Sequence, residues 1–237
     1  GFLVTFSVLA VADGVGGWAE VGVDPANTLD YSAEVIVFIY EYPISIGELI
    51  KSAWDNYKTN PKQLLIDAAN RTKVEEAGTL EILILNPSTL VIVNLDQEKP
   101  ILRTAYIGDS GYMIIRLFPS ARILEYRKEN KQIKLVFQSE EQQREFNFPY
   151  QVKKNNPHYS HKIGSYGDPP QWAAEFQHEI KNNDVVVVGS DGLFDNIDHN
   201  QIINTIKPFL EVSDELPDVP LVAEMIAKLA YKCSLDP

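Results

Sequence analysis

Three hydrophobic runs of this chain each end in a short turn that combines aspartate with glycine. The turns are Val11-Ala12-Asp13-Gly14, Ile107-Gly108-Asp109-Ser110-Gly111 and Val188-Gly189-Ser190-Asp191-Gly192. A short apolar run bounded by turn residues is typical of a buried strand. An aspartate at the end of such a strand is held by a sheet and exposed at its rim, where carboxylate oxygens suit hard divalent cations. The sequence therefore predicts that three distant segments contribute to one metal site.

Composition limits the class of protein. The chain has 237 residues and is 45% hydrophobic, which fits a single domain over residues 1–237. Its formal net charge of −12 would repel a phosphate backbone, so we expect no nucleic-acid partner. The single cysteine, Cys233, excludes an intrachain disulfide and favours an intracellular, reducing compartment. Because no run reaches the roughly 20 apolar residues of a membrane span, we expect no such span. The sequence does not determine the oligomeric state, and we favour a monomer.

The spacing of apolar residues and breakers predicts a mixed order of strands and helices. The expected strands are Phe2–Ala12, Leu80–Leu85, Leu90–Leu95, Leu102–Ile107, Tyr112–Leu117, Ile123–Tyr126 and Asp184–Gly189. The expected helices are Tyr31–Tyr42, Ile46–Tyr57, Pro61 to about Val74, Asp198–Phe209 and Leu221–Ser234. Short turns separate the middle strands, as in an antiparallel meander. We interpret Asn130–Gln151 as an irregular excursion and Asn155–Pro170 as a surface loop, which leaves an α+β domain with largely antiparallel sheets.

Other cofactor and nucleophile motifs are weak or incomplete. Gly14–Ala19 matches a loose dinucleotide-binding pattern, but the following segments give no clean βαβ unit with an acidic residue after its second strand. The glycines are not followed by the Gly-Lys-Ser/Thr of a phosphate-binding loop. Neither Ser110 nor Ser190 lies in a G-x-S-x-G turn. The histidines, which show no metal-binding spacing, are His158, His161, His178 and His199.

Each acidic turn, taken alone, also has an ordinary structural interpretation. Asp13 would be a helix N-cap or turn residue, and Asp109 would belong to a hairpin between two strands. Asp191 would be an N-cap, although Asp195 or Asp198 would serve the following helix as well. The functional interpretation therefore depends on the three turns acting together.

In this order and at these separations, the turns resemble the type-2C metal-dependent protein serine/threonine phosphatases (PPM type). The segments that carry the resemblance are Val11–Trp18, Ile107–Gly111 and Ser190–Asn196. Further matches extend it over nearly the whole chain and resemble a branch that includes mitochondrial and plastid members. They are Pro25, Gln63-Leu64-Leu65, Ala68, Lys73, Gln142-Gln143, Phe146-Asn147-Phe148-Pro149, Ala230-Tyr231 and Ser234-Leu235-Asp236-Pro237.

The resemblance implies a fold and a chemistry. The fold would be a four-layer α/β/β/α sandwich of two mainly antiparallel sheets flanked by helices. Two or three Mg²⁺ or Mn²⁺ ions would be bound, with Asp13 bridging two ions and the Gly14 carbonyl contacting one. Asp191 would bind the first ion, and Asp109 with Asp191 would form the weaker third position. A metal-bound water, not a catalytic side chain, would attack phosphoserine or phosphothreonine in a phosphoprotein substrate.

The sequence departs from the family pattern at the Asp13-Gly14 turn and at both ends of the chain. Val15 stands where many members carry a histidine after Asp-Gly, although the branch in question normally has valine there. The family also supplies acidic metal ligands from a strand upstream of Phe2 and from a turn downstream of Pro237, and the sequence contains neither. The chain is then either truncated at both ends, which we favour, or a catalytically impaired phosphatase-like binding or scaffold module.

Overall fold

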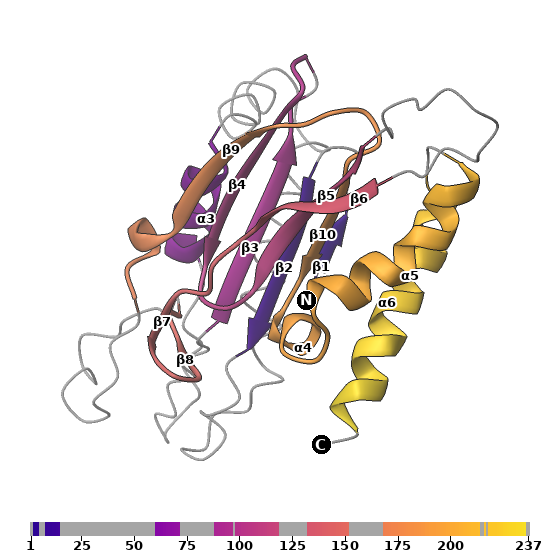
Figure 1. Cartoon of the computed structure of the whole chain (residues 1–237). Helices are drawn as coiled ribbons and strands as arrows, with labels where there is room; N and C mark the ends of the chain where they lie inside the picture. The colour runs from indigo at the N-terminus through magenta and orange to yellow at the C-terminus, as the bar shows by residue number, and fades with distance from the viewer. Residues whose placement is uncertain are drawn as a thin grey trace. The chain divides into compact units, whose positions relative to one another are not determined.

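The computed structural model describes residues 2–4, 8–14, 60–71, 88–96, 98–118, 132–151, 168–213, 216 and 218–235. They belong to two compact units, the first comprising Gly1–Ser110 with Glu141–Glu179 and the second Gly111–Glu140 with Ile180–Pro237. Each unit combines antiparallel β-strands with helices (Figure 1), which confirms the predicted α+β class.

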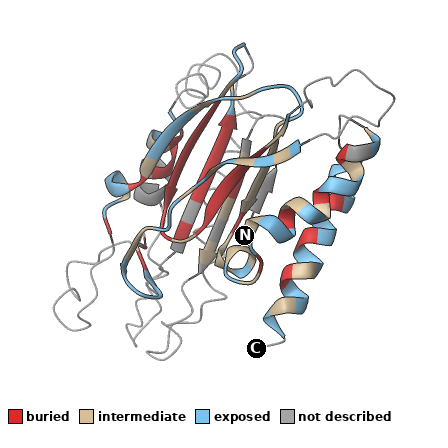
Figure 2. Cartoon of the chain, viewed as in Figure 1, coloured by how far each residue is buried: buried red, intermediate tan, exposed pale blue. Residues whose placement is uncertain are grey.

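The first unit is built on a five-stranded antiparallel sheet with the order β1-β2-β3-β4-β9. Its strands are β1 (Phe2–Val4), β2 (Val8–Gly14), β3 (Ser88–Leu95), β4 (Ile101–Ile107) and β9 (Ala174–Glu179). Strand β4 is buried from Leu102 through Ile107, so both of its faces are covered (Figure 2). Burial on both faces is typical of a strand in an inner layer of a layered fold.

Helix α3 (Pro61–Arg71) covers part of this sheet and packs against β3, β4 and β9. Pro61 suits the first helical position, and the Asn60 side chain just before it accepts a hydrogen bond of 2.9 Å from the Gln63 amide. Leu64 and Leu65 are buried, as expected for the apolar stripe of an amphipathic helix. The helix predicted to begin at Pro61 is confirmed.

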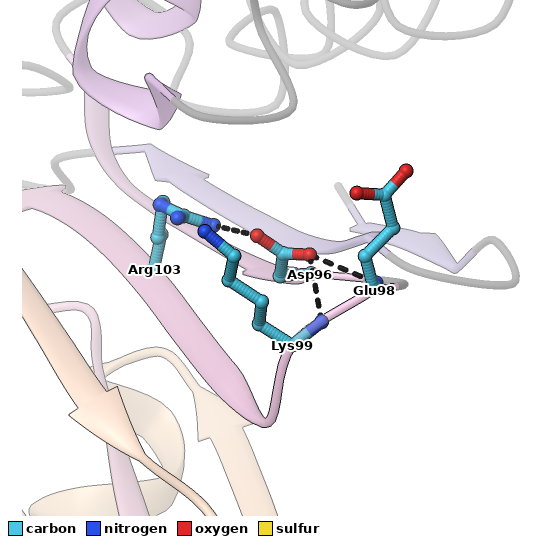
Figure 3. A network of polar contacts seen from close by, with 4 residues as sticks. All are labelled: Asp96, Glu98, Lys99 and Arg103. Carbon is cyan, nitrogen blue, oxygen red and sulfur yellow. Dashed lines mark hydrogen bonds and ion pairs between the residues drawn. The ribbon is translucent and has the colours of Figure 1, made fainter.

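The turn between β3 and β4 is organised by an aspartate (Figure 3). Asp96 accepts a hydrogen bond of 2.6 Å from the Arg103 guanidinium and bonds of 2.9 and 3.1 Å from the Glu98 and Lys99 amides. The Arg103 bond, with the Glu98 amide next in importance, lowers the pKa of Asp96 from 3.8 to about 2. This aspartate therefore stabilises a turn.

A small hairpin and a short 3₁₀ helix complete the described part of the first unit. The hairpin pairs β7 (Gln143–Glu145) with β8 (Phe148–Pro149), and the 3₁₀ helix is η3 (Pro170–Trp172). Arg144 of the hairpin forms an ion pair with the buried carboxylate of Asp168, and its guanidinium lies 5.8 Å from the ring centre of Trp172. The hairpin is thereby attached to the segment that leads into β9.

The second unit has a three-stranded antiparallel sheet with the order β10-β5-β6. Its strands are β5 (Gly111–Phe118), β6 (Gln132–Gln138) and β10 (Val185–Gly189), and its helices are α4 (Asp191–Phe194), α5 (His199–Val212) and α6 (Val219–Ser234). The hydrophobic core of this unit is formed by side chains of β5, α5 and α6 together with Ile197. Its buried residues are Met113, Ile115, Ile197, Ile202, Ile206, Leu210, Val222, Ile226 and Ala230. None of the helices that the structure describes is long and apolar enough to cross a membrane.

Polar contacts fix the ends of the elements in the second unit. Helix α5 begins with a capping box, in which Asp198 and Gln201 each accept a hydrogen bond from the other's backbone amide. Arg116 of β5 binds Asp184, just before β10, through two hydrogen bonds of 2.7 Å, and the Asp184 side chain is only 2% exposed. A buried bidentate pair of this kind fixes the register of the two strands.

The structure confirms most of the elements predicted in the described ranges. The strands β3, β4, β5 and β10 and the helices α3, α5 and α6 lie where the apolar pattern places them. The four valines of β10 are only half-buried, however, because β10 is an end strand of its described sheet. Five predictions lie outside the described residues: the helices at Tyr31–Tyr42 and Ile46–Tyr57, the strands at Leu80–Leu85 and Ile123–Tyr126, and nearly all of the loop at Asn155–Pro170.

Three predictions of local structure are wrong. The run Phe2–Ala12 forms two paired antiparallel strands, β1 and β2, because a continuous apolar run does not reveal where a chain reverses. Asn130–Gln151 contains strand β6 and the β7–β8 hairpin, because the exposed positions of a half-buried antiparallel strand accept polar residues. Strands β4 and β5 do not form a meander, because they belong to different sheets.

Candidate metal centre

Asp13 and Gly14 form the last two positions of strand β2. In the antiparallel register of β2 and β3, Asp13 lies opposite Thr89 and Gly14 lies opposite Ser88. The Asp13 side chain is half-buried. The strand thus holds the backbone of Asp13 while leaving its carboxylate partly open to solvent, as the sequence predicts. The alternative of a helix N-cap at Asp13 is excluded.

Asp109 lies in the turn that leaves the five-stranded sheet after β4 and leads into β5 of the other sheet. The hairpin interpretation of this residue is therefore wrong, because β4 and β5 are not paired. Gly108 has a φ of +95°, and a Cβ there would lie 2.5 Å from Thr89 Cγ2 and 2.6 Å from the Tyr150 carbonyl oxygen. Only glycine fits both this conformation and this space. The Asp109 side chain is half-buried.

A buried hydroxyl pair brings the Asp109 turn toward the strand opposite Asp13. The Thr89 and Ser110 hydroxyl oxygens are 2.7 Å apart, and the two residues are 2% and 1% exposed. Opposite residues of an antiparallel pair project from the same face, so the Thr89 and Asp13 side chains share a face of the sheet. Strand β3 alone separates β2 from β4, which places their backbones about 10 Å apart. Asp13, Gly14 and Asp109 therefore lie at one end of one sheet.

Asp191 is the first residue of α4 in the second unit, directly after β10 and Ser190. Its Oδ1 accepts a hydrogen bond of 2.6 Å from the Gly192 amide, and its side chain is half-buried. Ser190 occupies the N-cap position of α4 and Asp198 that of α5, so the interpretation of Asp191 as an N-cap is wrong. Because Asp191 belongs to the second unit, its approach to Asp13 and Asp109 stays a prediction.

The candidate residues fit a hard divalent cation in their chemistry. Three carboxylates and one backbone carbonyl offer only oxygen donors, which Mg²⁺ and Mn²⁺ prefer over nitrogen and sulfur. All three acidic residues lie at or just beyond strand ends and are half-buried. Within the described residues, no group of three or more Asp, Glu, His or Cys side chains is already assembled around a common point.

The remaining titratable and nucleophilic candidates have structural surroundings. Ser110 is buried against Thr89, and Ser190 caps α4 without a side-chain hydrogen bond to that helix. His178 lies on β9 with its ring 6.0 Å from that of Phe176, and burial lowers its pKa. His199 is the first residue of α5, and His158 and His161 lie outside the described residues.

The structure adds two residues that sequence reasoning did not place in the site. Gln142 hydrogen-bonds to Gly108 across 34 positions of sequence, and Thr89 lies opposite Asp13 and bonds to Ser110. Gln142 is one of the residues that carry the family resemblance, which assigns it no role in the site. No local signal marks either residue, because both act through contacts between distant segments.

Curated relatives of this chain are named as protein phosphatases. The chain is 30% identical over 227 residues to the protein phosphatase PTC7 homolog fig of Drosophila grimshawi, a match that covers 96% of the chain and 63% of that relative. It is 29% identical to the PTC7 homologs of Xenopus laevis and Homo sapiens, over 98% and 97% of the chain and 67% and 64% of those proteins. The chain thus spans 63 to 67% of the length of these three relatives. No family model matches it.

Solved structures give the same assignment. The X-ray structure of the photosystem II phosphatase PBCP is 27% identical, with a TM-score of 0.68 and coverage of 98% of this chain and 72% of that one. The catalytic domain of the serine/threonine phosphatase PstP, solved with two manganese ions, shares the fold at 17% identity, a TM-score of 0.54 and coverage of 98% and 84%. Together with the order of the three acidic turns, these likenesses show that the chain belongs to the type-2C, metal-dependent family of protein serine/threonine phosphatases.

Proposed function

We propose that this chain carries the centre of a Mg²⁺- or Mn²⁺-dependent phosphatase that hydrolyses phosphoserine and phosphothreonine in phosphoprotein substrates. The observation that carries the proposal is the placement of Asp13, Gly14 and Asp109 at one end of the five-stranded sheet. Relatives that bear phosphatase names match this chain over nearly all of its length. The PstP catalytic domain, which shares the fold, binds two manganese ions.

Each candidate residue has a separate part in the proposed site. Asp13 would bridge two ions, the Gly14 carbonyl would contact one of them, and Asp191 would bind the first ion. Asp109 with Asp191 would form a third and weaker position. When bound there, such cations supply positive charge against the phosphate oxygens and lower the pKa of a coordinated water. The protein itself holds half-buried carboxylates at strand ends. The positions of these negative charges are therefore fixed before the substrate binds.

The proposed function bears on the domain organisation, the oligomeric state and the cellular location of the protein. We infer that both compact units belong to one phosphatase domain over residues 1–237, since the candidate acids are divided between them. We infer a monomer in an intracellular compartment. A mitochondrial or plastid location rests on the resemblance to one branch of the family.

The decisive experiment measures hydrolysis of a phosphothreonine peptide with increasing Mn²⁺. We expect turnover that requires the metal and that falls by at least about 100-fold in Asp13→Asn and in Asp191→Asn. Asp198→Asn is the matched control, because it makes the same acid-to-amide change while asparagine caps a helix as well as aspartate does. Its activity should equal that of the wild type.

The competing hypothesis is a catalytically impaired binding or scaffold module. It predicts that the folded chain binds a phosphopeptide without hydrolysing it at any Mn²⁺ concentration. Turnover that survives unchanged in Asp191→Asn would contradict both hypotheses, because the activity would then come from another site or from a contaminant. Calorimetric titration with Mn²⁺ gives a readout that does not depend on turnover, and it should show weaker binding in Asp13→Asn.

A further inference from the structure

Gln142 forms hydrogen bonds with both backbone polar groups of Gly108. Its side-chain Oε1 accepts a hydrogen bond of 3.3 Å from the Gly108 amide, and its own backbone amide donates one of 2.9 Å to the Gly108 carbonyl oxygen. Gly108 directly precedes Asp109. A residue that occupies both polar groups of the preceding position limits the directions in which the Asp109 backbone can turn.

Gln142 is itself anchored at two further points. Its side-chain Nε2 donates a hydrogen bond of 3.1 Å to the Trp172 carbonyl oxygen of η3, and its carbonyl oxygen accepts one of 2.8 Å from the Tyr150 amide. The residue is half-buried between the β7–β8 hairpin and η3. Both ends of its carboxamide are therefore used, one toward the Asp109 turn and one toward the supporting structure.

The other flank of Asp109 is fixed as well. Ser110 is 1% exposed, and its hydroxyl lies 2.7 Å from that of Thr89 on β3. Gly108 is confined by its positive φ and by a lack of space, since an added Cβ would meet Thr89 and the Tyr150 carbonyl oxygen. Asp109 is thus the half-buried residue between two constrained neighbours, and the flanking contacts fix the position of its backbone.

We propose that Gln142 is a positioning residue for Asp109, which aims the Asp109 carboxylate and so determines the affinity of the weakest Mn²⁺ position of the site. This inference rests on the proposed function. A purely structural role for Gln142 would change stability without a specific effect on that position. The two roles differ in whether the effect of Gln142 depends on the Asp109 carboxylate.

The test is a double-mutant cycle in Mn²⁺ affinity, measured by calorimetry and by the electron paramagnetic resonance signal of free Mn²⁺. Gln142→Ala should weaken the weakest Mn²⁺ position by about 10-fold while leaving tighter positions within about twofold. In an Asp109→Asn background, the same change should have no further effect. Gln143→Ala is the matched control, because Gln143 is a neighbouring glutamine whose side chain bonds to Glu141 and Asn147 of the hairpin.

Gln142→Glu keeps an oxygen that accepts from the Gly108 amide but removes the donor to Trp172, so it should restore part of the lost affinity. Amide hydrogen exchange at Gly108, measured without metal, should speed up in Gln142→Ala and stay slow in Gln143→Ala. Equal losses with and without the Asp109 carboxylate, or an unchanged weakest position in Gln142→Ala, would overturn the inference alone. A wild-type chain that binds no Mn²⁺ would overturn the proposed function and this inference together.

Discussion

The Asp109 turn and the Asp191 turn have similar sequences but are held in different ways. The Asp109 turn depends on Gln142 and Thr89, which lie 34 positions from Gly108 and 21 positions from Ser110. The Asp191 turn is held by short-range bonds, among them the Gly192 amide to Asp191 Oδ1 and the Asn196 side chain to the Gly192 carbonyl oxygen. The first is held by long-range contacts, and these bonds of the second are local.

This difference predicts where each turn is vulnerable. In the Asp109 turn, small changes meet closely packed backbone and buried hydroxyls, so they should cost much stability. In the Asp191 turn, a Cβ added at Gly192 would meet only Ser190 Oγ, at 3.5 Å, and the Ser190 side chain makes no capping hydrogen bond, so changes at these two positions should cost little. Substitution of one glycine and of the serine in each turn tests this comparison directly.

The largest effect is expected from Gly108→Ala. Alanine would have to adopt a φ of +95° and place its Cβ 2.5 Å from Thr89 Cγ2. Backbone strain and overpacking together should lower the free energy of unfolding by about 3–5 kcal/mol. Urea denaturation followed by tryptophan fluorescence measures this change. A loss below about 1 kcal/mol would mean that the turn rearranges readily and that the long-range contacts do not hold it.

The second effect concerns the serines of the two turns. Ser110→Ala removes a buried hydrogen bond to Thr89 and should cost about 1–3 kcal/mol. Ser190→Ala should cost less than about 0.5 kcal/mol, because the Ser190 side chain makes no capping hydrogen bond to α4.

Urea midpoints of the two serine variants, measured side by side, show which serine contributes more to stability. The double variant Thr89→Val with Ser110→Ala should lose less than the sum of the single losses, since both changes remove the same bond. Equal losses in Ser110→Ala and Ser190→Ala would break the comparison between the turns.

Much of the fold could be predicted from sequence where the determinants are local. The capping residues Asp198 and Asn60, and the apolar stripe of α3, mark helices whose signals lie within a few residues. The strand ends at Asp13 and Asp191 follow from apolar runs that stop at an acidic turn. At these two positions the sequence predicts the local structure correctly.

The remaining features depend on contacts that no local pattern encodes. Strand β6 alternates exposed with half-buried positions, but its half-buried residues Ile133, Leu135 and Phe137 stand within a polar stretch of sequence that conceals the strand. The chain changes sheets between Ile107 and Gly111, although the sequence there is that of an ordinary hairpin. Gln142 is likewise an unremarkable polar residue until folding brings it to Gly108. Long-range contacts therefore hold the turn around Asp109, whereas the hydrogen bonds given above for the Asp191 turn join residues within four positions of one another.

Gly192→Ala should have a smaller effect than either change in the Asp109 turn, and one of opposite sign. Gly192 lies in α4, and a Cβ there would meet only Ser190 Oγ, at 3.5 Å. Because alanine favours helical backbone and loses less entropy on folding, the variant should be more stable by up to about 1 kcal/mol. Thermal unfolding followed by circular dichroism measures the shift. Destabilisation as large as that of Gly108→Ala would show that the Asp191 turn is just as tightly packed.

The smallest effect is expected at Asp96, whose turn combines local amide bonds with one bond to Arg103, seven positions away. These bonds lower the pKa of Asp96 to about 2 in the folded chain, against 3.8 ordinarily. A lowered carboxyl pKa stabilises the fold above the unfolded-state pKa, and that contribution is lost as the pH falls from about 4 toward about 2. The stability difference between wild type and Asp96→Asn should therefore be constant near neutral pH and shrink over this window. Urea midpoints measured from pH 6 to pH 2.5 test this, with Glu98→Gln removing the same charge from the same turn while keeping the bonds to Asp96. An Asp96→Asn difference that does not change with pH would mean that the bonds to Asp96 do not require its charge.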